Sequence, residues 1–190
     1  MTASRPMPEQ IPSRTGVWVG IAAITMSFGA YTSAMLVREG SGMDWQRIHL
    51  PAILYWNTLT LLVSSGTLEM ARRRLAPPVS ADAARAGRGL LAATLALGVL
   101  FVAGQVAAWR ALAAQGVYLA SGPAASFFYV FTVLHALHLL GGVVGLGIAG
   151  ARVRADVGVR ALTSLGSASV YWHFMGVLWL YLLAILTIKM

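Results

Sequence analysis

Three of the four histidines in this sequence lie inside apolar segments, where an imidazole could bind a metal ion or a haem. His135 and His138 belong to residues 126–142, SFFYVFTVLHALHLLGG, and His173 belongs to residues 171–179, YWHFMGVLW. Because His135 and His138 are three residues apart, they share one face of a helix and cannot supply both axial ligands of one haem, which approach from opposite sides. One of them together with His173 could do so.

Two further interpretations of these histidines are open. Three imidazoles could form a metal site, although the lack of a nearby carboxylate argues against a catalytic one. Alternatively, the histidines are neutral and form hydrogen bonds between helices, with Thr132, Gln105, Tyr171 or a lipid headgroup as partners. We favour this second interpretation, so we expect no catalytic residue, metal site or cofactor site in this chain.

The aromatic residues in the same segments also fit a structural role. Trp109, Trp172, Trp179 and Tyr181 are of the types that anchor helices at a membrane interface or fill the packing between helices. We expect them to do this rather than to surround a cofactor.

Composition indicates a membrane protein. Of the 190 residues, 58% are hydrophobic and 11% are charged, whereas about a quarter are charged in a typical soluble domain. The net charge of +8 comes from arginines at the ends of apolar segments, a pattern typical of topology signals rather than of nucleic-acid binding. There is no cysteine, which excludes disulfides and thiolate metal sites. The first apolar segment is too long for a cleavable signal peptide.

The predicted fold is all-α, a single bundle of five transmembrane helices. A helix needs about 20 residues to cross the hydrocarbon layer, and five apolar segments meet this length, at about residues 16–37, 51–74, 89–113, 123–151 and 165–188. Residues 1–15, with three prolines, form a leader that we expect to be mobile, and residues 16–190 form one domain.

The distribution of positive charge predicts the orientation. With five spans, one side of the membrane holds ten arginines, namely Arg5, Arg14, Arg72, Arg73, Arg74, Arg85, Arg88, Arg152, Arg154 and Arg160. The other side holds Arg38, Arg47, Arg110 and Lys189. Because Lys and Arg are retained in the cytoplasm, we expect the N-terminus inside and the C-terminus outside.

The spans contain little that could carry a proton or an ion. Glu69 is the only acid within them, and Arg72 and Arg73 stand three and four residues further on, where they can pair with it. A second possibility is that Glu69 meets a partner subunit. A charge at mid-membrane is costly and usually functional, so the lack of one argues against a transporter.

The order of motifs resembles the cytochrome c oxidase subunit III family, in its five-helix bacterial form. The first part of the match is Arg38, Trp45, Leu50-Pro51, Asn57-Thr58 and Ser64-Ser65-Gly66-Thr67. Gly98, Phe101, Gln105 and Trp109 are similar to the family's GxxFxxxQxxxW helix. Residues 126–142 resemble FF…TxxHxxHxxxG, and Tyr171-Trp172-His173-Phe174 with Trp179 resembles YWHFxxxxW.

The resemblance implies a non-catalytic core subunit of a respiratory haem-copper terminal oxidase in a bacterial inner membrane. Such a subunit packs on subunit I, associates with subunit II and possible smaller or supercomplex subunits, holds structural phospholipids and sustains turnover, while haem and copper lie in its partners. The enzyme as a whole would be a cytochrome c or quinol oxidase. The residues we expect to contact lipid or to form structural polar sites are Arg14, Asn57, Glu69, Arg72, Arg73, Gln105, Trp109, His135, His138, Trp172, His173 and Trp179.

Three acids found in many relatives are missing. Ile24, Ala108 and Gly176 stand where those relatives have a glutamate, a glutamate and an aspartate. This absence also fits a divergent oxidase, a quinol oxidase or an accessory subunit of a nitric oxide reductase. The histidines leave a further alternative open, a small cytochrome that binds haem through His173 and a histidine of residues 123–151. The proteins that co-purify with the chain, and its colour, would distinguish these alternatives.

Overall fold

The computed structural model describes residues 15–190, which form five helices and no strand. The helices are α1 (Thr15–Ser41), α2 (Ile53–Arg74), α3 (Ala81–Ala114), α4 (Pro123–Ala155) and α5 (Val159–Lys189). The all-α prediction is thus confirmed for this part of the chain. Arg14 and most of the predicted leader lie outside the described residues.

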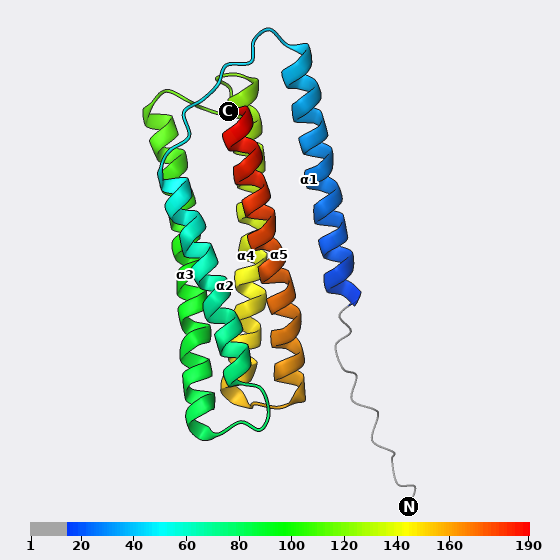
Figure 1. The fold of residues 1–190 in the computed structure, drawn as a ribbon, viewed down its shortest axis with the longest axis vertical. Helices are drawn as coiled ribbons and strands as arrows, with labels where there is room; N and C mark the ends of the chain where they lie inside the picture. Colours follow the sequence, from blue (N-terminus) through cyan, green and yellow to red (C-terminus); the bar gives the residue numbers. More distant parts are fainter. Residues whose placement is uncertain (1–14) are drawn as a thin grey trace, which may run out of the picture.

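Successive helices run in opposite directions, and α2 to α5 form a four-helix bundle (Figure 1). Within this bundle α2 packs on α3 and α5, and α4 packs on α3 and α5. Helix α1 lies at the edge, where it contacts α4 and α5 but neither α2 nor α3. The face that α1 presents to them consists of Ile24, Phe28, Thr32 and Met35, spaced three or four residues apart as one side of a helix requires.

Two helices begin earlier than the apolar segments suggest. Helix α3 starts at Ala81 rather than near residue 89, and α5 starts at Val159 rather than near residue 165. At the start of α3 the Ser80 side chain accepts a hydrogen bond from the Ala83 backbone amide at 3.2 Å, and Asp82 lies in the first turn. Both features stabilise a helix N-terminus. The length of an apolar segment predicts the part of a helix that crosses the membrane. It does not predict the polar turns by which the helix extends beyond that part.

Glycines allow α3, α4 and α5 to pack closely around one aromatic side chain. Trp172 of α5 is fully buried. A β-carbon placed on Gly98 of α3 would lie 2.5 Å from Cη2 of Trp172, and one on Gly142 of α4 would lie 3.4 Å from its Cε3. Real β-carbons do not approach ring atoms as closely as the first of these distances, so Gly98 is required where the indole meets α3.

Four helices, α1, α3, α4 and α5, are long and apolar enough to cross a membrane. Helix α2 does not meet the same criterion within the described part of the chain. It carries several polar residues, among them Asn57, Ser64 and Glu69, together with three consecutive arginines at its end.

Candidate functional site

His135 lies at the centre of the bundle as part of an aromatic cluster. It is fully buried, with its ring centroid 5.9 Å from that of Phe101 on α3 and 5.1 Å from that of Trp179 on α5. Neither ring nitrogen forms a hydrogen bond with another residue in the described part of the chain. The expected hydrogen bond from this imidazole to another helix is therefore not found, and the ring packs as an aromatic group.

His138, one turn further along α4, is satisfied by its own helix. Its Nδ1 lies 2.7 Å from the backbone oxygen of Leu134. A carbonyl oxygen only accepts, so Nδ1 carries the proton in this arrangement. A hydrogen bond between helices does exist here, but it runs from the Tyr171 hydroxyl to the backbone oxygen of His138 at 3.0 Å and not to the ring.

His173 faces a different part of the molecule. It lines a groove of about 180 Å³ between α2 and α5, together with Ser65 and Gly176. Its charged neighbours are Glu69 and Arg72 of α2. Residues Tyr171 and Trp172, which precede it, face α4 instead. The structure therefore does not bring His173 next to the histidines of α4, where both the haem and the three-imidazole interpretations require it.

The described residues also contain no group of three or more His, Asp or Glu side chains that could hold a metal ion. What the interior does contain is a set of polar side chains joined in pairs across helices. Such pairs can position the helices relative to one another.

Two tryptophans donate to hydroxyl groups on neighbouring helices. Nε1 of Trp179 lies 2.9 Å from Oγ1 of Thr58, and Nε1 of Trp109 lies 3.0 Å from Oγ1 of Thr132. Trp172 and Trp179 are fully buried, so they fill the packing between helices. Thr58 was not among the predicted site residues, and its place next to Asn57 in the NT motif is the only sequence signal for it.

The two buried amides differ in their partners. Nδ2 of Asn57 donates to the backbone oxygen of Phe101 at 3.3 Å, which links α2 to α3. Gln105 is fully buried, and neither its Oε1 nor its Nε2 has a partner among the described residues.

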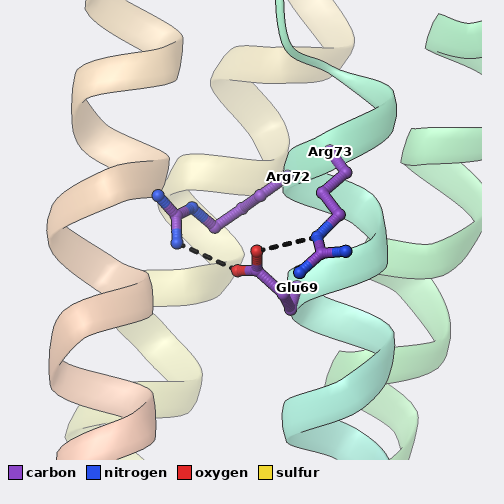
Figure 2. Close-up of polar contacts among 3 residues, drawn as sticks. All are labelled: Glu69, Arg72 and Arg73. Atoms are coloured by element: carbon purple, nitrogen blue, oxygen red, sulfur yellow. Dashed lines mark hydrogen bonds and ion pairs between the residues drawn. The ribbon is translucent and has the colours of Figure 1, made fainter.

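Glu69 forms ion pairs with both arginines that follow it, as predicted (Figure 2). Its Oε2 lies 3.1 Å from Nη1 of Arg72, and its Oε1 lies 3.1 Å from Nε of Arg73. The three side chains line a second groove, of about 320 Å³, between the end of α2 and the start of α5. The two arginine side chains approach the carboxylate from different sides (Figure 2).

At the opposite end of the bundle, two ion pairs and a hydrogen bond join the end of α1, the loop after it and the end of α5. Arg38 pairs with Asp44 at 2.6 Å, and this hydrogen bond holds the pKa of Asp44 below its usual range. Lys189 pairs with Glu39 at 2.8 Å, and Nε1 of Trp45 donates to the backbone oxygen of Lys189 at 3.1 Å. Arg38 and Asp44 are six residues apart, so their pairing could be suggested by the sequence. The other two contacts join segments far apart in the sequence and could not.

The three positions where relatives have an acid differ in environment. Ile24 and Ala108 are buried, so a carboxyl group at either would face other helices of the bundle. Gly176 lines the groove with His173.

Comparison with known proteins places this architecture in a family. The model of the cytochrome c oxidase subunit III family matches residues 21–188. The chain is 29% identical to a cytochrome c oxidase subunit 3 of Thermostichus vulcanus over 181 residues, which cover 91% of this chain and 85% of the relative. It is 27% identical to a probable cytochrome c oxidase subunit 3 of Mycobacterium bovis, over 94% of this chain and 88% of the relative.

A third relative is named as a subunit of a ubiquinol oxidase, and it is nearly as similar to this chain as the first two. The chain is 26% identical to a cytochrome bo(3) ubiquinol oxidase subunit 3 of Pseudomonas putida, over 90% of this chain and 86% of the relative. The motifs, the apolar helices and these matches agree over the same part of the sequence. The chain is a multi-pass membrane protein that belongs to the cytochrome c oxidase subunit III family, the third subunit of haem-copper oxidases.

Proposed function

We propose that this chain is the non-catalytic core subunit III of a respiratory terminal oxidase in a bacterial inner membrane. It packs on the haem-bearing subunit I, holds phospholipids and sustains turnover, while haem and copper are bound by its partners. The observation that carries this proposal is the family match over residues 21–188, which extends through all five helices. The geometry supports the non-catalytic role, because the three histidines lie in different environments. His135 packs against Phe101, His138 bonds to its own helix, and His173 lines the groove between α2 and α5.

The proposal includes a fifth span, helix α2. Its average polarity is high because Asn57, Ser64 and other polar groups face α3 and α5, where they form hydrogen bonds such as the one from Ser64 to the Thr94 backbone oxygen. The exposed side chains of α2 that precede Glu69 in the sequence are mostly apolar: Tyr55, Trp56, Leu59, Leu62 and Val63. A helix with this distribution can face lipid while its polar groups are satisfied inside the protein.

Five spans place the N-terminus in the cytoplasm and the C-terminus outside, because the arginine-rich ends are retained inside. The chain has no cysteine, so single cysteines can report the topology directly. We expect a membrane-impermeant thiol reagent to label Asp44→Cys and Gln115→Cys from outside in intact cells. Arg85→Cys and Asp156→Cys should be labelled only after the cells are broken. Labelling of residues 44 and 115 from opposite sides would contradict the five-span arrangement.

The subunit role is tested by purification. A tagged chain isolated in mild detergent should bring with it a haem-bearing subunit at a stoichiometric ratio, and the same chain expressed alone should show no haem absorbance. Haem that stays with the isolated chain and is lost in His173→Ala would contradict the proposal. Recovery of the intact chain without any haem protein would contradict it as well.

The lipid role is tested at the end of α2. Arg73 is largely exposed, and a guanidinium can bind a phosphate through two nitrogens. We expect Arg73→Ala to lower the amount of co-purifying phospholipid and to shorten the active lifetime of the complex more than its initial rate. Glu69→Gln is the matched control, because it removes the ion pair but keeps both arginines. An equal fall in initial rate with unchanged lipid content would assign Arg73 to proton entry instead.

A further inference from the structure

Two polar side chains at the centre of the bundle have hydrogen-bonding groups that the chain itself does not use. Gln105 of α3 and His135 of α4 are both fully buried. Neither amide atom of Gln105 and neither ring nitrogen of His135 has a hydrogen-bond partner among the described residues. A buried polar group without a partner disfavours the folded state by about tenfold, so these four atoms call for a physical explanation.

The contacts on either side of Gln105 place it opposite His135. On α3, Phe101 stands one turn before Gln105 and Trp109 one turn after it, on the same side of the helix. The ring of Phe101 packs against His135 with centroids 5.9 Å apart, and Nε1 of Trp109 lies 3.0 Å from Oγ1 of Thr132. Because α3 and α4 are antiparallel (Figure 1), the side chain between these two contacts lies at the level of the turn from Thr132 to His135.

The surroundings of the imidazole offer it no partner and include two small side chains. Ala108 of α3 and Ala136 of α4 are buried near this level, and each carries only a methyl group. The ring of Trp179 packs on His135, with centroids 5.1 Å apart, but its only N–H group is already bonded to Thr58. A partner for the ring nitrogens must therefore be a small molecule that fits between the helices.

The chemistry of the four atoms limits what that molecule can be. An amide side chain offers donors and an acceptor, and a neutral imidazole offers one of each. An apolar molecule would leave all of them unpaired, and an ion would bring a charge that uncharged side chains cannot balance. Neither Gln105 nor His135 lines the groove between α2 and α5 or the groove at Glu69, so neither groove leads a larger ligand to them. Water both donates and accepts, and buried waters typically bind otherwise unpaired groups of this kind.

We propose that Gln105 and His135 together bind one internal water molecule, which joins α3 to α4 at the centre of the bundle. The water accepts a hydrogen bond from one side chain and donates one to the other. This explains why an imidazole that packs as an aromatic ring is not simply a phenylalanine, and why a glutamine lies in an otherwise apolar region. The site goes beyond the proposed function, because it depends only on residues of this chain.

Cryo-electron microscopy of the complex purified from the membrane tests the site directly. At a resolution that shows internal waters elsewhere in the complex, we expect one density peak within hydrogen-bond distance of the Gln105 amide and of a ring nitrogen of His135. No peak there, while other internal waters are visible, would overturn the proposal. A direct hydrogen bond between the two side chains would overturn it as well.

A double-mutant cycle tests whether the two residues share the water. Gln105→Met and His135→Phe keep the size of the side chains and remove their polar atoms, and each is followed by unfolding of the full chain in detergent micelles. Each substitution leaves the other residue and the water without a partner, so each should raise the equilibrium constant for unfolding by about tenfold. The double variant should also show about a tenfold rise and not about a hundredfold one, because the second substitution removes a group that has already lost its bridge.

Residues without a water would behave differently. If both side chains are dry and unpaired, each substitution removes an unfavourable buried group, and the unfolding constant should fall or stay unchanged. Ser169→Ala combined with Gln105→Met is the control, because Ser169 is also fully buried without a partner among the described residues but lies on α5. Their effects should multiply, and effects of Gln105→Met and His135→Phe that multiply in the same way would contradict a shared water.

Discussion

Replacing Trp179 by alanine is expected to lower the free energy of unfolding of the chain by about 3–5 kcal/mol. The indole is fully buried, its centroid lies 5.0 Å from that of Phe101 in a perpendicular arrangement, and it donates to Thr58. Alanine leaves a cavity at the junction of α2, α3, α4 and α5 and removes the hydrogen bond. Unfolding in detergent micelles, followed by circular dichroism, measures the effect.

Trp56→Ala is the control for this prediction, because Trp56 is 70% exposed and is not part of the buried core. Its substitution should change stability in micelles by well under 1 kcal/mol. Trp179→Phe separates packing from the hydrogen bond, whose loss alone costs about 1 kcal/mol. Equal losses in Trp179→Ala and Trp56→Ala would show that Trp179 does not lie in the core.

Gly98→Ala is expected to destabilise the chain by about 1–3 kcal/mol, although alanine favours a helix. The new methyl group would lie 2.5 Å from the ring of Trp172, which is buried on all sides and cannot move away easily. The strain must spread into the packing of α3 on α5. The same unfolding measurement detects it.

The matched substitution on the same helix is Gly89→Ala. A β-carbon on Gly89 meets no atom within 4 Å, so only the helix preference for alanine applies, worth up to about 1 kcal/mol in favour of the folded chain. The two substitutions should therefore change stability in opposite directions. Stabilisation by both would mean that Trp172 does not pack against Gly98.

Contacts between neighbours in the sequence were predictable, because helical spacing decides them. Apolar length predicted the helical fold, and the positions of Glu69, Arg72 and Arg73 within one turn predicted their ion pairs. Charge and spacing within one helix suffice for such a contact.

Contacts between helices were not predictable, since they depend on how each helix is rotated about its axis. Trp179 and Thr58 are 121 residues apart, and nothing in either segment indicates that they meet. A site shared by His173 and a histidine of α4 required α5 to turn His173 towards α4, yet His173 lines the groove between α2 and α5. The mean hydropathy of α2 likewise does not show on which side of the helix its polar residues lie. In the structure Asn57 and Ser64 face the other helices.

The edge position of α1 has a consequence for how the protein is made. Helices α2 and α3 are joined by a short loop and can pair as soon as both are in the membrane. Helix α1 is synthesised first, yet it contacts only α4 and α5, and the hydrogen bond from Tyr181 to Thr32 spans 149 residues. At a translation rate of about 5–20 residues per second, its partners emerge on the order of 10 s later. During that interval lipid or the insertion machinery must cover Phe28 and Met35, which the finished protein buries.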